Sequence, residues 1–350
     1  MSLLEDTCSR IVGPDEGIRV EVGKRLDAKT KPRRSLGRLE DLACAVAAIQ
    51  GTEHPSVRRK AVVVMAADHG VAASGVSAFP QEVTGQMVLN FAAGGAAISV
   101  LARHGGADVV IVDMGCRAAT PAHHAVLDRR IGPGTRDFTR GPAMTHEEVV
   151  RAVEAGIGVA TNLADRGVSL VGLGDMGIGN TTAASAMAAA FLGTPPEQVT
   201  GRGTGVDDAG YRRKIEAIRR ALEVNRPDAS DALDVLSKVG GFEIAGLAGM
   251  ALGAAARRIP VLLDGLITTA AAFSATRLVP AARGCLLPSH GSVEIGHRRL
   301  LEALGTRPLL DLEMRLGEGT GAALAMHLVE ASIRILDEMA TFTSAGVSER

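Results

Sequence analysis

A glycine-rich segment at residues 172–182, GLGDMGIGNTT, has the composition of an anion-binding loop. Glycines let the backbone approach an anion closely, and the N-terminus of a following helix supplies free N–H groups. Asn180, Thr181 and Thr182 would add side-chain donors. The segment lacks the Gly-Lys-Ser/Thr ending of a Walker loop and does not fit the spacing of dinucleotide-binding loops. Two interpretations remain: a phosphate cradle, or a tight strand-to-helix turn capped by Asn180.

A second glycine cluster, TGRGTG at residues 200–205, precedes a segment that contains Arg212, Arg213 and Lys214. A lysine in the first turns of a helix can reach back to a phosphate that the glycine backbone holds. Taken alone, the three basic residues could equally form a solvent-exposed helix face. Two such loops in one chain favour a site for a phosphorylated ligand.

The segment RLGEGTG at residues 315–321 places a carboxylate between two glycines at the start of a predicted helix. The glycines leave room for a flat heteroaromatic ring against Glu318, which is the access that a general base needs. The helix dipole would lower the pKa of such a first-turn glutamate and weaken it as a base. Burial in an apolar pocket would raise its pKa instead. The sequence does not decide between these two effects.

Histidine patterns do not indicate a metal site. The pair Asp68-His69 could bind a metal or move a proton, but a hydrogen-bonded structural corner is the commoner role for such a pair. His123 with His124, and His290 with His297, lack a third ligand at a suitable spacing, and surface or capping roles suffice for them. We therefore expect neither a metal nor a cofactor.

Five short apolar runs, which must position these loops, alternate with longer amphipathic segments. The runs are residues 61–66, 107–112, 168–173, 259–263 and 284–287. This alternation predicts an α/β fold, with a parallel sheet and helices on both faces in a Rossmann-like three-layer arrangement. Polar residues with glycine follow each run: DHG at 68–70, DMG at 113–115, GDMG at 174–177, DG at 264–265 and SHG at 289–291. Because ligands bind beyond the carboxyl ends of parallel strands, these loops predict one shared site.

Helical periodicity accounts for most of the remaining chain. We expect helices at residues 81–104, 146–166, 180–192, 207–224, 242–257, 267–278, 292–304 and 320–339, with a helical N-terminal segment at 15–50 that Pro32 interrupts. Residues 116–144 show no clear periodicity, and we expect them to pass over the surface.

The composition is that of an ordinary globular protein. The chain has 350 residues, of which 46% are hydrophobic and 22% charged, and its net charge is −1 with basic residues spread along the length. This spread excludes a basic nucleic-acid-binding tract. The N-terminus lacks the pattern of a signal peptide, and runs such as 244–256 are shorter than the ~20 residues that span a bilayer. The four cysteines are widely separated, as expected of buried thiols in the cytoplasm.

Together, these residues resemble the nicotinate-nucleotide:dimethylbenzimidazole phosphoribosyltransferase family of cobalamin biosynthesis over nearly the whole chain. The matching blocks are residues 26–42, 67–71 with 75–80, 174–182, 201–214, 263–265, 288–297 and 316–323. The resemblance implies transfer of a 5-phosphoribosyl group from nicotinate mononucleotide to 5,6-dimethylbenzimidazole, giving α-ribazole 5′-phosphate. It also implies a homodimer, no metal, and three segments: an N-terminal helical part of a small domain (1–58), a catalytic α/β domain (59–312), and a C-terminal part of the small domain (313–350).

The resemblance assigns roles to individual residues. Glu318 matches the catalytic glutamate, which would take the azole proton while the other ring nitrogen attacks C1′ of the ribose. Phosphate and ribose would be held by Gly177, Gly179, Asn180, Thr181, Thr182, Gly203, Gly205, Lys214, Asp264, Gly291 and Ser292, with Asp264 a candidate for the ribose hydroxyls. The benzimidazole would lie against Ser77, Phe79, Gln86, Met87 and Leu316.

Two positions depart from the family pattern. Asp175 replaces the usual glutamate that supports the base, and it is shorter by one methylene. Arg33 and Arg34 stand where Pro-Gly is usual, for which we expect only a local structural effect. Two alternatives therefore remain: the same chemistry with adenine, another purine, another benzimidazole or a phenol as acceptor, or a nucleotide-binding protein that has lost turnover. The sequence leaves open whether a partner subunit completes the site.

Overall fold

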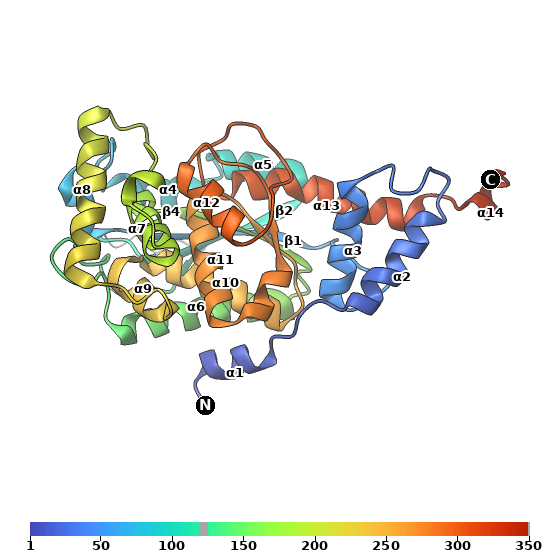
Figure 1. Cartoon of the computed structure of the whole chain (residues 1–350), viewed down its shortest axis with the longest axis horizontal. Helices are drawn as coiled ribbons and strands as arrows, with labels where there is room; N and C mark the ends of the chain where they lie inside the picture. The colour runs from blue at the N-terminus through green and yellow to red at the C-terminus, as the bar shows by residue number, and fades with distance from the viewer. Residues whose placement is uncertain (119–124, 349–350) are drawn as a thin grey trace.

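Within the residues that the structure describes, the protein is built on a six-stranded parallel sheet (Figure 1). The computed structural model describes residues 1–118 and 125–348. The strands are β1 (Lys60–Ala67), β2 (Ala107–Gly115), β3 (Val126–Asp128), β4 (Leu170–Met176), β5 (Val261–Leu263) and β6 (Leu286–Pro288). Each pairs in parallel with its neighbour in the order β3-β2-β1-β4-β5-β6. The predicted parallel α/β fold is confirmed.

The strand order reverses direction between β1 and β4. From β1 the chain extends the sheet through β2 to β3, and it then returns to the other side of β1 to add β4, β5 and β6. The crossovers above the carboxyl ends of β1 and β4 therefore run in opposite directions. In open α/β sheets such a switch point leaves a crevice where ligands bind.

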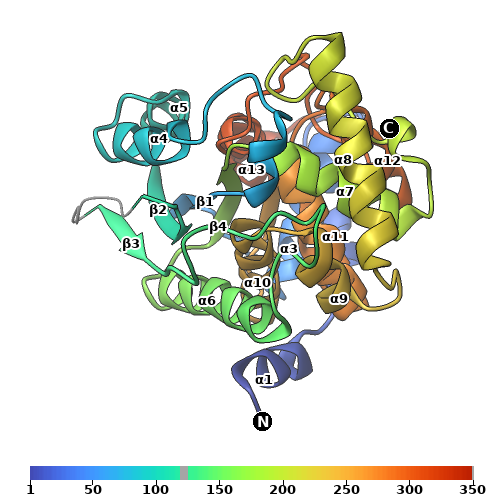
Figure 2. The same ribbon diagram turned by 90° about the vertical axis from the view of Figure 1, so that its left-hand side faces the viewer.

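Helices cover both faces of the sheet (Figure 2). They are α1 (Leu3–Arg10), α2 (Glu16–Asp27), α3 (Arg38–Gln50), α4 (Val83–Ala92), α5 (Ala97–Gly105), α6 (His146–Asp165), α7 (Asn180–Leu192), α8 (Asp208–Asn225), α9 (Ala232–Val239), α10 (Phe242–Ala256), α11 (Leu266–Leu278), α12 (Ile295–Ala303), α13 (Thr320–Glu338) and α14 (Phe342–Ala345). Side chains of β1 alternate between the two faces, as the geometry of a strand requires. Val63 and Met65 join the core formed with α6 and α10, whereas Val62 and Val64 join the core formed with α5 and α13.

A group of helices extends beyond the sheet. Helices α2 and α3 lie beside the C-terminal half of α13 (Figure 1), and their core is continuous with the core of the α13 face. Lys29 donates from Nζ to the Met339 carbonyl oxygen at 2.7 Å, which joins α2 to the end of α13. Helix α1 instead packs on α6 and α10. The division at residues 58 and 312 stays a prediction.

Several elements differ from expectation. The predicted helix at 81–104 is two helices, because Gly94 has a φ of +77° and ends α4 before α5 begins. Helices α1 and α9 and strand β3 were not predicted. The prediction that residues 116–144 pass over the surface is wrong for part of the segment. Within it, β3 forms one edge of the sheet, and Phe138 is fully buried.

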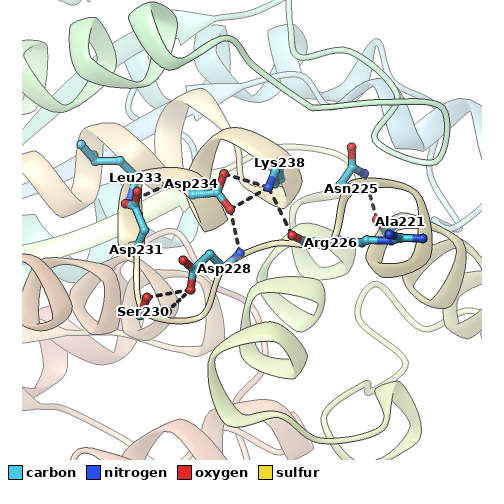
Figure 3. A network of polar contacts seen from close by, with 9 residues as sticks. All are labelled: Ala221, Asn225, Arg226, Asp228, Ser230, Asp231, Leu233, Asp234 and Lys238. Atoms are coloured by element: carbon cyan, nitrogen blue, oxygen red, sulfur yellow. Dashed lines mark hydrogen bonds and ion pairs between the residues drawn. The ribbon is translucent and has the colours of Figure 1, made fainter.

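A polar network fixes the connection between α8 and α9 (Figure 3). Lys238 donates from Nζ to Asp234 at 2.9 Å and to the Arg226 carbonyl oxygen at 3.2 Å. Asn225 donates to the Phe138 carbonyl oxygen at 2.7 Å, which ties this connection to the segment before α6. The Asp68 carbonyl oxygen accepts from the backbone of that segment directly after β1. The segment therefore supports the sheet edge where β1 ends.

One helical stretch, Val83–Gly105, is long and apolar enough by composition to cross a membrane. It consists of α4 and α5, which break at Gly94, and α5 packs between β2 and α13. The fold thus uses it as a pair of covering helices.

Helices α6 and α10 approach each other closely because glycines line their contact. A methyl group at Gly156 of α6 would overlap the Gly246 carbonyl oxygen of α10, and one at Gly249 would overlap the Val153 carbonyl oxygen. Gly158, two residues further along α6, is exposed, and a methyl group added there would have no neighbour within 4 Å.

This contrast gives a matched pair of substitutions. Gly156→Ala should lower the free energy of unfolding by about 1–3 kcal/mol, because the added methyl forces the helices apart. Gly158→Ala should raise it by about 0.5–1 kcal/mol, because alanine favours the helix and meets no neighbour. Urea unfolding followed by circular dichroism measures both values. Shifts of the same sign would contradict the close helix contact.

Candidate active site

A cavity of about 490 Å³ opens at the carboxyl edge of the sheet. This volume is typical of a small-molecule site. It is lined by Phe79, Val83, Met87, Asp175, Met176, Gly177, Ile178, Asn180, Thr181, Gly203, Thr204, Gly265, Leu266, Ile267, His290, Ser292, Glu294, Arg315, Leu316, Gly317 and Glu318. Segments that follow β1, β4, β5 and β6 therefore share one site. The prediction that all five loops contribute is wrong for the described residues that follow β2, which lie outside the cavity.

The cavity brings together ten of the predicted site residues: Glu318, Asp175, Gly177, Asn180, Thr181, Gly203, Ser292, Phe79, Met87 and Leu316. The other eight predicted residues do not line it: Gly179, Thr182, Gly205, Lys214, Asp264, Gly291, Ser77 and Gln86. The contacts of these eight residues show which of them hold the cavity-lining segments in place.

Glu318 lies two residues before the start of α13, in an unusual backbone conformation. Its φ is +63°, and the adjacent glycines Gly317 and Gly319 have φ values of +83° and +86°. A left-handed non-glycine residue is uncommon, and such strain persists only where surrounding structure enforces it. The side chain is buried, and its Oε2 has no hydrogen-bond partner among the described residues. Burial raises the pKa of Glu318. A hydrogen bond from the Ile98 N–H lowers this pKa, and the charge of Asp264 raises it. The structure thus raises the proton affinity of this glutamate, which the helix dipole alone would lower.

Asp264 holds the strained segment in place. Its Oδ2 accepts from the Gly319 N–H at 3.0 Å, and its Oδ1 accepts from the Gly321 N–H at 2.7 Å. The carboxylate is fully buried, and His290 Nε2 lies 3.3 Å from Oδ1. Both oxygens therefore accept hydrogen bonds from backbone N–H groups on either side of the first residue of α13. Asp264 fixes Glu318 and does not face the cavity, contrary to the expectation of a contact with ribose.

Asp175 lies beneath the same segment at the end of β4. Its Oδ2 accepts from Asn180 Nδ2 at 2.8 Å, while Oδ1 has no partner within the described parts of the chain. A methyl group at Gly317 would be 3.4 Å from either carboxylate oxygen. Burial raises the pKa of Asp175 well above its usual value, and the charges of Asp264 and Glu243 raise it further. Asp175 is thus a buried carboxyl group that favours its neutral form.

The first glycine loop leads from β4 into α7. Gly179 has a φ of +96° and directly precedes the helix. A methyl group at Gly177 would be 2.5 Å from the Ala67 carbonyl oxygen, so only glycine permits this approach to β1. The loop brings Asn180 and Thr181 to the cavity wall at the positive end of the α7 dipole. Thr182 is fully buried behind them.

The second glycine loop packs against the first. Gly203 and Gly205 have φ values of +53° and +94°. Lys214, on α8, is fully buried and donates from Nζ to Thr181 Oγ1 at 2.8 Å. A methyl group at Gly203 would lie 2.8 Å from that nitrogen. Lys214 therefore sits directly behind the point where the two loops meet and supplies a positive charge there.

Sequence reasoning missed two charged residues that join this loop to the rest of the site. Arg315 Nη1 donates to the Gly203 carbonyl oxygen at 3.3 Å. Glu294 Oε1 accepts from the Gly203 N–H at 2.9 Å. Both line the cavity. Their sequence signal is weak, because a glutamate before a helix and an arginine in a loop are ordinary surface patterns.

Apolar side chains form another part of the wall. Phe79 and Leu316 line the cavity but remain 53% and 56% exposed. Two large apolar side chains left this open suit a ligand that covers them. Met87 lies deeper in the same wall. Ser77 Oγ instead lies 3.2 Å from Thr204 Oγ1, and Gln86 is exposed on α4.

His290 and His297, for which surface or capping roles were predicted, are both buried. His290 is 1% exposed and lines the cavity. His297 Nδ1 accepts from the Ser292 N–H at 3.0 Å, and burial, followed by the charge of His290, lowers the pKa of His297 to about 3. Of the two predicted roles, the surface role is wrong because the segment before α12 folds inward to reach the cavity, whereas the bond from Ser292 to His297 is a capping contact. Gly291 anchors that segment through its N–H to the Leu310 carbonyl oxygen.

Asp68-His69 forms a structural corner, as the commoner interpretation held. His69 Nε2 lies 2.6 Å from Glu243 Oε1, with both side chains fully buried under Gly177. Asp68 Oδ2 accepts from the Arg117 N–H at 2.7 Å. Within residues 1–118 and 125–348, no group of three or more His, Cys, Asp or Glu side chains could hold a metal ion. The pair at positions 123 and 124 lies outside the described residues.

The environment of Asp175 predicts a pH-dependent effect on stability. A carboxyl group whose folded-state pKa is raised stabilises the fold at low pH, and this contribution is lost as the pH rises toward the folded-state value. Asp175→Asn should therefore gain stability relative to wild type as the pH rises above about 4, the ordinary pKa of an aspartate. Thermal unfolding at a series of pH values measures the difference, with the exposed Asp311→Asn as control. A constant difference would contradict a raised pKa.

The chain is similar to known proteins over nearly its whole length. A family model described as "Phosphoribosyltransferase" matches residues 11–347. Proteins named nicotinate-nucleotide–dimethylbenzimidazole phosphoribosyltransferase are 56% identical in Roseiflexus sp. strain RS-1, over 99% of both chains, and 55% identical in Geobacter metallireducens, over 100% of this chain and 99% of that one. A crystal structure of that enzyme from Thermus thermophilus superposes with a TM-score of 0.91 at 49% identity, covering 96% of this chain and all of that one. The chain belongs to the phosphoribosyltransferase family that includes these nicotinate-nucleotide–dimethylbenzimidazole enzymes.

Proposed function

We propose that this phosphoribosyltransferase moves the 5-phosphoribosyl group of nicotinate mononucleotide to 5,6-dimethylbenzimidazole. The products are α-ribazole 5′-phosphate and nicotinate, and the former supplies the lower ligand of cobalamin. The names of relatives that match over the full chain support this activity. The observation that carries the proposal is Glu318, a buried carboxylate with one oxygen that has no partner among the described residues, beside apolar walls and two glycine loops in one cavity.

Glu318 is the general base. Burial raises its pKa, which brings it closer to the range in which a base accepts a proton effectively at neutral pH. Its carboxylate takes the azole proton while the other ring nitrogen attacks C1′ of the ribose. Asp264 is a positioning residue in this reaction, because it fixes the backbone on both sides of the start of α13.

The donor requires little help to release nicotinate. The ring nitrogen bonded to C1′ is a quaternary pyridinium, so nicotinate departs with the bonding electrons and needs no proton. The protein's tasks reduce to alignment and to removal of one proton from the acceptor. Attack from the face opposite the leaving group inverts C1′ and turns a β-nucleotide into an α-product.

The two glycine loops bind the donor. Phosphate lies against Gly177, Asn180, Thr181 and the 203–205 loop, with Lys214 behind them supplying charge. Ser292 lines the same cavity from the segment that Gly291 anchors. Gly179 and Thr182 shape the first loop from behind.

Phe79, Met87 and Leu316 form the acceptor surface, and their apolar character favours a benzimidazole over a more polar purine. Ser77 and Gln86 stay proposed contacts at its rim. Acceptance of adenine or a phenol is the second candidate, because the exposed Phe79 and Leu316 do not restrict the shape of the ring. We further propose that the enzyme acts in the cytoplasm as a homodimer without a metal or cofactor.

The first test is acceptor-dependent release of nicotinate, measured by chromatography. Wild-type protein should release nicotinate only when a benzimidazole is present. Glu318→Gln should lower kcat by about 10²–10⁴-fold, because general-base catalysis supplies an effect of that size. Glu313→Gln, an exposed neighbour in the same loop, should retain full rate.

Three results would contradict the proposal in different ways. Unchanged activity of Glu318→Gln would exclude the mechanism whichever acceptor is used. Preferred conversion of adenine or a phenol in a mixture of acceptors would exclude dimethylbenzimidazole as the favoured substrate. Binding of the mononucleotide in a calorimeter without any turnover would favour a non-catalytic nucleotide-binding role.

Donor binding should also depend on the charge of Lys214. Burial lowers the pKa of Lys214 to about 8, partly opposed by the charge of Glu294. The lysine loses its proton above this pH, so kcat/KM for nicotinate mononucleotide should fall about fivefold between pH 8 and pH 9. Lys214→Met should lower kcat/KM by about 10–100-fold at pH 7 and remove this decline. A decline of the same shape in the variant would assign it to another group.

A further inference from the structure

Glu294 has a position that neither the fold nor the base catalysis explains. It directly precedes α12 in the segment after β6, and it is 7% exposed at the cavity wall. Its Oε1 accepts from the Gly203 N–H at 2.9 Å. The carboxylate therefore lies on the glycine loop that is proposed to bind the donor's phosphate.

The contact with this loop is close. A methyl group at Gly201 would overlap Oε2 of Glu294 and lie 2.9 Å from Oε1. Oε2 has no hydrogen-bond partner in the described portion of the protein. Gly203 and Gly205 have positive φ values, and such turns expose N–H groups that attract anions. The carboxylate thus occupies an anion-binding position of the protein itself.

Electrostatics prevent Glu294 and a phosphate from sharing this position. The loop offers the Gly203 N–H, and Lys214 behind it is fully buried. Two anions competing for one buried cation and one N–H would repel each other strongly, because interactions between charges are weakly screened there. A phosphate that binds here must displace the carboxylate.

A displaced Glu294 would have another partner available. The ribose hydroxyls of a nucleotide are commonly bound by a carboxylate. Asp264 is poorly placed for this, since it is fully buried, does not line the cavity, and accepts from the backbone of Gly319 and Gly321. Glu294 lies on the cavity wall, within a side chain's reach of the loop that would hold the phosphate, and the ribose is covalently attached to that phosphate.

We propose that Glu294 is a specificity-determining residue of the donor site. In the free protein its carboxylate holds the phosphate position. The donor's phosphate displaces it, and it then accepts hydrogen bonds from the ribose hydroxyls. Displacing Glu294 costs binding free energy for every anion. Only a ribose phosphate offsets part of this cost, because its hydroxyls donate hydrogen bonds to the displaced carboxylate. The residue therefore discriminates against inorganic phosphate. This inference rests on the proposed phosphate subsite.

The test is calorimetric binding of inorganic phosphate and of ribose 5-phosphate, without acceptor and without turnover. Wild type should bind ribose 5-phosphate and bind inorganic phosphate weakly. Glu294→Gln removes the charge and keeps the side chain's size, so it should bind inorganic phosphate roughly tenfold more tightly. The affinity ratio of ribose 5-phosphate to inorganic phosphate should fall by at least the same factor. Glu302→Gln, an exposed position on α12, should behave as wild type.

Unchanged or weaker phosphate binding by Glu294→Gln would overturn the proposal, because Glu294 would then only hold the loop in shape. An unchanged ratio would overturn the discrimination between the two ligands. If the variant does not fold, a crystal structure of wild type with ribose 5-phosphate decides: a Glu294 still bonded to Gly203 would refute displacement. Absence of binding to either protein would refute the phosphate subsite as well, while nicotinate release tests the transfer separately.

Discussion

The geometry of the site depends on one buried carboxylate, that of Asp264. By accepting from the N–H groups of Gly319 and Gly321, it fixes the backbone around Glu318 and the first turn of α13. A left-handed glutamate between two left-handed glycines is costly, and these two hydrogen bonds help to offset that cost. The charge of Asp264 also raises the pKa of Glu318. One residue thus orients the proposed base and adjusts its proton affinity.

The cavity combines opposing electrostatic influences. Helices α7, α11 and α13 all begin beside it, and their positive ends favour anions. Against them stand several buried carboxylates, among them Asp175, Glu294 and Glu318. Burial disfavours the charged forms of Asp175 and Glu318. These three carboxyl groups therefore have different states. Asp175 favours its neutral form, Glu294 pairs with a backbone N–H, and one oxygen of Glu318 has no partner in the described part of the chain.

The fold places these groups together because the site lies at the switch point of the sheet. Elements far apart in the chain meet there because β1 and β4 are neighbours while the segments that follow them diverge. Glycines allow the close approaches that this requires, as at Gly177 against the Ala67 carbonyl oxygen. The strained and buried groups of the site therefore rest on the central strands of the sheet, which are buried on both faces.

The sequence by itself determined the parallel α/β fold, five of the strands, both glycine loops and the glutamate between glycines that we propose as the base, because periodicity and local composition encode these features directly. It missed β3, the break at Gly94 and the burial of Phe138, since short edge strands and irregular segments leave little periodic signal. Only the tertiary structure decided that Asp264 accepts hydrogen bonds from the backbone near Glu318 and that Glu294 lies on the second glycine loop. These hydrogen bonds join residues that are far apart in the chain, separated by 57 positions for Asp264 and Gly321 and by 91 positions for Glu294 and Gly203. They depend on how strands and helices pack, and the pattern of residues along the chain does not specify them.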